Sequence, residues 1–352
     1  MSRILKYCDA IREALDVSLG RDSSVYLMGL GVPDPKGIFG TTSGLQEKYG
    51  SERVFDIPIS ENGMTGIAIG SAITGKRPIL THQRLDFALL AIEQMVNQAA
   101  KWHYMFGGQV SVPAVFRMIL GRGWGQGPQH SQALHAWFAH IPGLKVVMPT
   151  TPHDAKGMLI ASIEDNNPVI FLEHRWLHNI SGIVPEGHYS VPIGPVRIAR
   201  EGKDVTIVAT STMVLEALRA AEILEIQNIS TEVIDLRTIN PLDRESIEHS
   251  VRKTGRLIVA DIGHYSFGIS GEIISGLIEK DLSIFKAPPV RIALPDIPTP
   301  TSHALAKNYY PRFPQLVVAA LQQCGIASLE SEFEDKNIQW TDVPDPSFTG
   351  PF

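Results

Sequence analysis

The sequence predicts an α/β protein with two parallel-sheet domains. Short apolar runs alternate with segments of helical periodicity along most of the 352 residues. The apolar runs are continuous rather than alternating, as in strands that are covered on both faces of a sheet. A Pro- and Gly-containing stretch without periodicity, 181–203, separates two such blocks, so we expect a linker there. With 44% hydrophobic and 19% charged residues, the chain is large enough for two cores.

Composition argues against membrane and secreted proteins. No apolar run reaches the length of a transmembrane helix, and the start, MSRILKYCDAIREAL, lacks the pattern of a signal peptide. The two cysteines, Cys8 and Cys324, lie near opposite ends of the chain, which fits neither a disulfide framework nor a metal motif. We therefore expect a cytoplasmic protein in a reducing environment, without a membrane partner.

The negative charge is concentrated at the C-terminal end. Of the net charge of −6, the stretch 326–352 contributes −5, from six acidic residues and one lysine. The remainder is nearly neutral, which argues against nucleic acid or an anionic membrane as partner. We predict an acidic tail over 326–352.

The first domain is predicted over 1–180. The first residues form an amphipathic helix with Ile4, Cys8, Ile11 and Leu15 on one face. A helical segment ends at Gly107-Gly108, and Thr151-Pro152 opens another helix. The loop 31–44 is long enough to suggest a functional or disordered segment. Strands are predicted at 24–29, 54–59, 77–81, 112–117, 144–148 and 169–173.

The second domain is predicted over 204–325. Its strands are expected at 204–209, 231–236, 256–261 and 290–294, and its helices at 213–224, from 243, and at 268–279. Such alternation implies right-handed crossovers and a parallel sheet.

The stretch VFDIPISENGMTGIAIGSAITG, 54–75, places one carboxylate, Glu61, between a strand and a glycine-containing helix. Each glycine costs a helix about 1 kcal/mol relative to alanine, so several suggest a close approach to the backbone. One interpretation is a helix-packing face beside an exposed turn glutamate. The other is a carboxylate in an apolar seam, where desolvation raises its pKa and lets it share a proton with a ligand nitrogen.

A second candidate is His130, which follows the glycine-rich loop GRGWGQG. Such a loop lets the backbone wrap a ligand, but single glycine-rich loops are weak motifs, and His130 equally suits the start of a helix. His135 and His140 follow at spacings of five, which no two-histidine metal motif uses, so we interpret them as non-ligands.

Several blocks in order resemble one family. They read IPISENGMTGIAIG, AIEQMVNQAAKWHYMFGG, QHSQALHAWFAHIPGLKVVMPTTPHDAKGMLIASIEDNNPVIFLEH and EVIDLRTINPLD. They resemble the beta subunit of thiamine-diphosphate-dependent 2-oxo acid dehydrogenases, whose members process pyruvate, branched-chain 2-oxo acids or acetoin. The resemblance spans residues 3 to 323. It implies a pyrimidine-binding domain followed by a transketolase C-terminal-like domain.

The resemblance also implies an enzyme divided between two chains in an α2β2 heterotetramer. The alpha subunit would grip the diphosphate through Mg²⁺, and this chain would hold the aminopyrimidine of thiamine diphosphate. The sequence lacks the Gly-Asp-Gly motif with a downstream Asn that such alpha chains use. A lipoyl acyltransferase core is a further partner that the family implies.

Position by position, Glu61 matches the glutamate that hydrogen-bonds the pyrimidine nitrogen and so activates the cofactor. Phe87 matches the aromatic residue that packs on the aminopyrimidine, although a core position on its helix is compatible with the same placement. Ile59 and Gln83 fall where the family lines this pocket. His130 matches a histidine near the reacting carbon, where it would donate a proton or orient the substrate.

The family further implies a structural monovalent cation such as K⁺. Its oxygen ligands would come from Ala114, Ser162, Ile163, Asp165 and Asn167. Oxygen ligands suit a hard cation, but a capped turn at Asp-Asn-Asn-Pro is a simpler interpretation.

Some positions depart from the family. Gly29-Leu30-Gly31-Val32 lacks the usual acidic residue, and Asp261-Ile262-Gly263-His264 replaces a segment that begins with Glu. The Arg84 and Asp86 pair suggests a more polar or anionic substrate, or else an external salt bridge. Together with the acidic tail and the run Leu305 to Lys307, these changes weaken the inference of docking to an acyltransferase core.

Two alternatives to a dehydrogenase subunit remain open from the sequence alone. One is a two-chain transketolase-like or carboligase enzyme that passes the fragment to an aldehyde. The other is a non-catalytic scaffold subunit, which would not need Glu61, Phe87 and His130 together.

Overall fold

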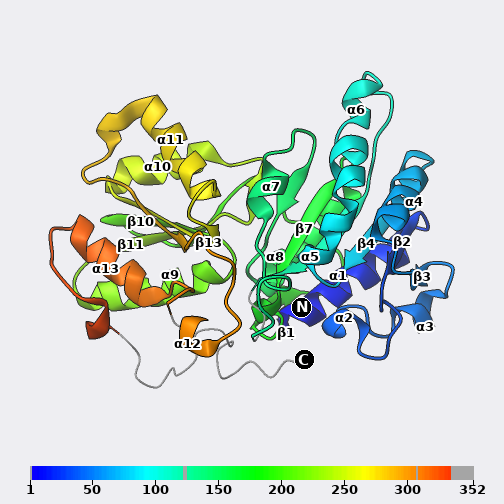
Figure 1. Cartoon of the computed structure of the whole chain (residues 1–352), viewed down its shortest axis with the longest axis horizontal. Helices are drawn as coiled ribbons and strands as arrows, with labels where there is room; N and C mark the ends of the chain where they lie inside the picture. The colour runs from blue at the N-terminus through cyan, green and yellow to red at the C-terminus, as the bar shows by residue number, and fades with distance from the viewer. Residues whose placement is uncertain (1, 122–124, 307, 334–352) are drawn as a thin grey trace. The chain divides into compact units, whose positions relative to one another are not determined.

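The computed structural model describes residues 2–121, 125–306 and 308–333 (Figure 1). These residues form two compact units. The N-terminal unit comprises 2–121 and 137–193, and the C-terminal unit comprises 125–136, 194–306 and 308–333. The segment 125–136 therefore groups with the C-terminal unit, although the first domain was predicted to run unbroken to 180. Most of the predicted acidic tail, and Lys307, lie outside the described residues.

The sheet of the N-terminal unit has the order β6–β7–β5–β4–β2–β3, and all these neighbouring strands are parallel. The side chains of β5 and β7 are buried throughout, which confirms the inference drawn from continuous apolar runs. The strands are β2 (Val25–Gly29), β3 (Val54–Phe55), β4 (Arg77–His82), β5 (Val115–Leu120), β6 (Lys145–Val147) and β7 (Val169–His174).

Helices cover this sheet. Helix α1 (Tyr7–Arg21) packs against α8 (Pro152–Glu164), and α4 (Glu61–Ile73) packs against β4. Helix α8 begins as predicted, because the Thr151 hydroxyl accepts a hydrogen bond of 3.1 Å from the Asp154 amide. The remaining helical elements of this unit are short: α2 (Gly37–Gly40), α3 (Leu45–Tyr49), α5 (Leu85–Ala88), η1 (Leu89–Ala91), the π-helical η2 (Gln94–Ala99), α6 (Trp102–Met105) and η3 (Arg175–Leu177). The short helix α7 (His135–Ala139) spans the boundary, since its first two residues group with the C-terminal unit.

The first residues were predicted wrongly as helix. Strand β1 (Ser2–Lys6) pairs antiparallel with β8 (Ser181–Pro185), and Ile4 is 73% exposed instead of lying on a buried helix face. The partner strand lies far along the chain, so local periodicity did not reveal the pairing.

The strand predicted over 54–59 is also shorter than expected. It ends at Phe55, because the Asp56 carboxylate accepts the Ile57 amide at 2.8 Å and Pro58 has no amide to donate. The residues from Asp56 to Ser60 are therefore irregular and lead into α4.

The C-terminal unit contains a second sheet, with the order β14–β13–β10–β11–β9. Four of its strands are parallel, and β9 is an antiparallel edge strand. Figure 1 shows α10 and α11 on one face of this sheet and α9 and α13 on the other. The strands of this sheet are β9 (Arg197–Arg200), β10 (Val205–Ala209), β11 (Thr231–Asp235), β13 (Leu257–His264) and β14 (Val290–Leu294). The short strand β12 (Thr238–Asn240) lies outside this sheet.

The predicted helices of this unit are present as α9 (Thr212–Ile226), α10 (Arg244–Thr254) and α11 (Ile269–Asp281). Helix α13 (Phe313–Gln323) packs against α9. Short helices complete the unit: η4 (Leu282–Ile284), α12 (His303–Ala306) and η5 (Glu330–Glu332). The interval 181–203, predicted as a linker, contains β8 and β9, and each of these strands pairs within its own unit.

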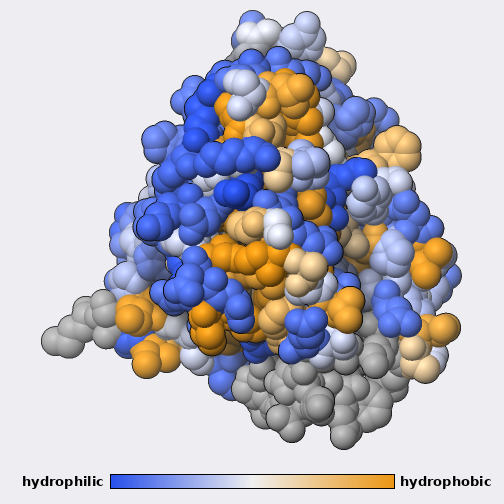
Figure 2. All heavy atoms as spheres, turned by 90° about the vertical axis from the view of Figure 1, so that its left-hand side faces the viewer, coloured by the Kyte–Doolittle hydropathy of each residue, from blue (hydrophilic) through white to orange (hydrophobic). Residues whose placement is uncertain are grey.

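The face shown in Figure 2 carries hydrophobic side chains in patches that hydrophilic side chains surround. Exposed apolar residues of the C-terminal unit include Ile226 and Leu282, which are 79% and 63% exposed. In the part of the chain that the structure describes, no helix is long and apolar enough to cross a membrane.

Candidate active site

Three segments meet at the carboxyl edge of the N-terminal sheet. They follow β2, β3 and β4, and hydrogen bonds join them: the Gly31 amide donates to the Asp56 carboxylate at 2.9 Å, and the Gln83 side-chain amide donates to the Leu30 carbonyl at 2.9 Å. Gly31 has φ of 75°, and a Cβ there would lie 2.8 Å from the Gln83 amide nitrogen. This edge is where α/β sheets place ligands.

Glu61 lies at this edge as the first residue of α4. A carboxylate in the first turn interacts favourably with the helix dipole. Its side chain is half-exposed in this chain, so the apolar seam expected around it is not formed by this chain. The preceding Ile59 is 79% exposed, and it offers apolar surface beside the carboxylate.

The glycines of α4 are only partly explained by packing. A Cβ at Gly63 would meet the Ser60 hydroxyl at 3.0 Å, and one at Gly66 would meet the Gln94 side chain at 3.4 Å. A Cβ at Gly70 would meet nothing within 4 Å. The face that carries Gly70 is therefore open among the described residues.

Phe87, in α5, is 36% exposed, so an aromatic side chain is available at the edge that carries Gln83. The neighbouring Arg84 and Asp86 are only 6% and 9% exposed. The alternative of an external salt bridge is therefore wrong. Burial lowers the pKa of Arg84, and the charge of Asp86 partly opposes this change.

His130 lies in the segment that groups with the C-terminal unit. Its side chain is half-exposed, and the regular helix begins only at His135. The interpretation of His130 as a helix-start residue is therefore wrong. Glu61 and His130 belong to different units of the chain.

His135 was interpreted as a non-ligand, and nothing contradicts that interpretation. The structure adds a role that sequence reasoning missed: His135 is completely buried, and its Nε2 lies 2.9 Å from Oδ1 of the equally buried Asp261. The departure from the family at Asp261 was the only signal for this pair, and it did not identify the histidine.

A second buried polar cluster lies between the strands of the N-terminal unit. Arg117 and Glu173 form an ion pair, and the His178 imidazole lies 3.3 Å from the same carboxylate. Burial alone would raise the pKa of Glu173, but the positive Arg117 and the neighbouring His178 imidazole lower it overall. Arg117 and Glu173 interrupt apolar runs on neighbouring strands, and this was the available sequence signal.

His82, at the end of β4, was also missed. Its side chain is buried, and its Nε2 has no hydrogen-bond partner within the described residues. Burial lowers its pKa to about 4, so the imidazole is neutral at physiological pH.

The residues predicted to bind a monovalent cation already take part in hydrogen bonds and ion pairs within the chain. Arg77 Nη1 donates to the carbonyls of Ile163 and Asp165, both at 2.9 Å. The Asp165 carboxylate pairs with Lys145 and accepts the amide of Asn167. The remaining predicted ligands are Ala114, whose carbonyl accepts the Val169 amide, and Ser162, whose hydroxyl donates to the Met158 carbonyl. These residues fit the capped turn better than a K⁺ site.

Two family models match the chain. The pyrimidine-binding domain of transketolase matches residues 4–179, and the transketolase C-terminal domain matches residues 194–316. The chain is 45% identical, over 90% of its length and 85% of the relative's, to the mitochondrial pyruvate dehydrogenase E1 component subunit beta-2 of Oryza sativa subsp. japonica. The chain belongs to the beta-subunit family of thiamine-diphosphate-dependent 2-oxo acid dehydrogenases.

Other relatives of this beta subunit are named as subunits of an acetoin oxidoreductase. It is 42% identical to the beta subunit of acetoin:2,6-dichlorophenolindophenol oxidoreductase from Cupriavidus necator, over 91% of this chain and 97% of that one. The Bacillus subtilis protein of the same name is 40% identical over 94% of this chain and all of that one. The family membership inferred from the sequence is confirmed.

A solved structure supports the fold. This beta subunit matches a split-gene transketolase, described as an inactive beta4 tetramer, with a TM-score of 0.74. The match covers 92% of this chain and 99% of the other, at 23% identity. The predicted two-domain transketolase-like fold is therefore confirmed.

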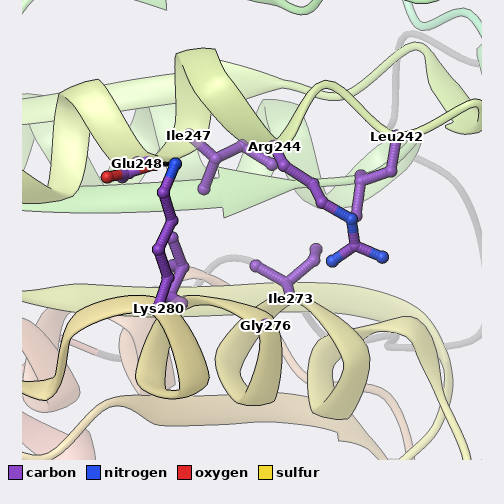
Figure 3. Close-up of a pocket in the computed structure, with 8 residues that line it drawn as sticks. Leu242, Arg244, Ile247, Glu248, Ile273, Gly276 and Lys280 are labelled. Atoms are coloured by element: carbon purple, nitrogen blue, oxygen red, sulfur yellow. Dashed lines mark hydrogen bonds and ion pairs between the residues drawn. The ribbon is translucent and has the colours of Figure 1, made fainter.

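The beta subunit also contains a hollow of about 90 Å³ between α10 and α11 (Figure 3). Leu242, Ile247, Ile273 and Leu277 give it an apolar lining, while Lys280 pairs with Glu248 across it. Arg244 points toward α11, where its guanidinium pairs with Glu272. Because both cations are paired, the hollow offers no free charge to an anion. Among the described residues, no three or more His, Cys, Asp or Glu side chains are grouped to hold a metal ion.

Proposed function

We propose that this chain is the beta subunit of a two-chain thiamine-diphosphate enzyme, active only with an alpha subunit. The reaction is decarboxylation of a 2-oxo acid and transfer of the acyl group to a lipoyl group. Support comes from relatives named as E1 subunit beta of pyruvate dehydrogenase at 44 to 45% identity. The proposed assembly is an α2β2 heterotetramer, and the lipoyl group that it acylates belongs to an acyltransferase partner.

The observation that carries this proposal is the position of Glu61. It is a half-exposed carboxylate at the start of α4, at the carboxyl edge of the sheet, with exposed apolar surface on Ile59. Phe87 adds an aromatic side chain after the next strand. A carboxyl group suits a ring nitrogen, and apolar and aromatic side chains suit a planar ring, so these residue types fit an aminopyrimidine.

Thiamine diphosphate, when bound, supplies the carbon nucleophile that attacks the substrate carbonyl. Glu61 holds a proton between its carboxyl oxygen and the pyrimidine nitrogen. Phe87 and Ile59 orient the ring and exclude water from that hydrogen bond. The alpha subunit covers the exposed side of Glu61, which strengthens the bond because screening by solvent is removed.

Gln83 lines the pocket, and one N–H of its side-chain amide donates to the Leu30 carbonyl. This bond fixes the loop after β2 relative to the segment that carries Phe87. His130 donates a proton to the substrate or orients its carboxylate, as its half-exposed imidazole permits.

The alpha subunit holds the diphosphate and Mg²⁺ in this proposal, since the chain lacks the Gly-Asp-Gly motif. We do not extend the proposal to K⁺, because Arg77 and Lys145 already bond to the oxygens that would bind it. A cytoplasmic location completes the proposal, although the plant relatives are mitochondrial by name.

The experiment begins with affinity purification of the chain from its own cells and identification of the proteins that co-elute. The reconstituted complex is then assayed for CO₂ release and dichlorophenolindophenol reduction with pyruvate, branched-chain 2-oxo acids and acetoin. Glu61→Ala should lower turnover by at least about a hundredfold without dissociating the complex. Glu52→Ala is the matched control, because Glu52 is an exposed glutamate of the same unit.

Each other outcome contradicts the proposal in a recognisable way. Ketol transfer without CO₂ release would identify a transketolase-like carboligase. Turnover of acetoin alone would exclude a 2-oxo acid as substrate. A chain that elutes without an alpha subunit and binds no thiamine diphosphate would be a scaffold, and full activity of Glu61→Ala would remove this carboxylate from the mechanism.

A further inference from the structure

The segment 125–134, which carries His130, is attached to the C-terminal unit at both ends. At its start, Gly125 and Gly127 have left-handed φ of 74° and 75°. A Cβ at Gly127 would lie 2.6 Å from the Thr301 hydroxyl, so only glycine permits this approach. At its end stands His135, the first residue of α7.

The second attachment is a buried hydrogen bond. His135 Nε2 lies 2.9 Å from Asp261 Oδ1, and neither side chain is exposed. The Thr210 hydroxyl donates to the same oxygen at 2.9 Å and in turn accepts the Ile262 amide at 3.4 Å. Thr210 follows β10 and Asp261 lies in β13, so two neighbouring strands orient the carboxylate.

Two glycines allow the backbone to lie close to the His135 and Asp261 side chains. A Cβ at Gly263 would lie 3.0 Å from His135 Cε1 and 3.1 Å from Asp261 Oδ2. A Cβ at Gly268 would lie 3.5 Å from the same carboxylate oxygen. The imidazole therefore lies directly against the backbone of β13, which restricts its rotation.

Electrostatics make the pair interdependent. Burial alone would raise the pKa of Asp261, but the charge and hydrogen bond of His135 and the hydroxyl of Thr210 lower it overall. Asp261 is therefore a carboxylate at neutral pH. Removal of the imidazole would leave a buried charge without its main partner, which is costly.

We propose that His135 and Asp261 are positioning residues for His130. Between the two attachments, residues 128–134 form no helix or strand, so the place of the His130 imidazole depends on where the segment is fixed. A displacement of about 1 Å in a reacting group costs on the order of a hundredfold in rate. This inference rests on the proposed function, in which His130 contacts the substrate.

The first test does not depend on activity. Hydrogen exchange of the amides in 125–134, measured on the full chain, should become about tenfold faster in His135→Leu. His135→Gln should stay near wild type, because its side-chain amide can still donate to Asp261. His140→Leu is the matched control, since His140 is an exposed histidine directly after α7. Unchanged exchange in His135→Leu would overturn the proposal.

The second test uses the complex with its alpha subunit. His135→Leu should lower kcat by about a hundredfold with little change in KM, and His135→Gln should recover most of the loss. In a His130→Ala background, His135→Leu should cost less than about twofold more, because both changes remove the same contribution. If the loss of kcat in the double variant equals the product of the losses in the two single variants, His135 does not act through His130.

If His135→Leu does not fold, Gly263→Ala provides the same test. The added methyl group displaces the imidazole, while the chain still contains both His135 and Asp261. If the wild-type complex shows no thiamine-dependent turnover, the proposed function fails, while the exchange measurement still decides whether His135 fixes the segment.

Discussion

Arg117 and Glu173 form an ion pair in which neither side chain is exposed to solvent. Glu173→Gln should lower the free energy of unfolding by about 3–5 kcal/mol, because Arg117 would remain buried without its counter-ion. Urea denaturation of the purified chain measures this change. Glu225→Gln is the control, since Glu225 is 71% exposed in its pair with Arg200 and its loss should cost less than about 1 kcal/mol. Equal effects would show that burial of the Arg117 pair has no energetic consequence.

His82 should make stability depend on pH. Its pKa is lowered from 6.5 to about 4 in the folded chain, so the unfolded chain binds the proton first as the pH falls. Its contribution is therefore fully present above pH 6.5 and is lost progressively down to about pH 4. At pH 5 the loss is about 2 kcal/mol.

The measurement for His82 is urea denaturation at pH 7 and pH 5. His82→Phe should reduce the difference between the two pH values by about 2 kcal/mol. His178 retains a pH dependence of the same sign in the variant, because burial also lowers its pKa. An identical difference in wild type and His82→Phe would show that His82 is accessible to protons in the folded chain.

Arg77 should replace a monovalent cation at the turn after α8. Melting temperatures in KCl and in choline chloride of equal ionic strength should agree. Arg77→Met should lower the free energy of unfolding by about 1.5–3 kcal/mol, because charged hydrogen bonds to the carbonyls of Ile163 and Asp165 are lost. A stabilisation of the wild-type chain specific to K⁺ would instead establish a cation site at these oxygens.

Phe87 should contribute to cofactor affinity. Phe87→Ala in the reconstituted complex should raise the concentration of thiamine diphosphate for half-maximal activity by about tenfold, since an aromatic face is lost. Phe87→Tyr should behave as wild type. The side chain is 36% exposed, so the folded chain should lose little stability. A large loss of stability with unchanged cofactor dependence would make Phe87 a core residue only.

Most strands and helices could be predicted because their signals are local. The side chains of β5 and β7 form continuous buried runs, and the sequence Thr151-Pro152 directly indicates the N-terminus of α8. The elements that were predicted wrongly depend on a distant partner strand or on a side-chain contact. Strand β1 exists because β8 pairs with it, and the early end of β3 depends on the side chain of Asp56.

In the candidate site, too, some residues could be predicted from the sequence and others could not. Resemblance placed Glu61, Ile59, Gln83 and Phe87 together, and the structure brings the segments that carry them to one edge of the sheet. The pairing of His135 with Asp261 joins residues 126 positions apart. Periodicity and spacing carry no information about such a contact, so it appeared only in three dimensions.

The assignment of 125–136 to the C-terminal unit has a consequence for engineering this chain. A hybrid built by exchanging everything after the β8 strand with a related subunit would separate the segment from the surface on which it rests. Three junctions, rather than one, are needed to transplant the second domain together with this inserted segment. Recombination libraries built with these three junctions should yield folded hybrids more often than libraries built with a single junction after β8.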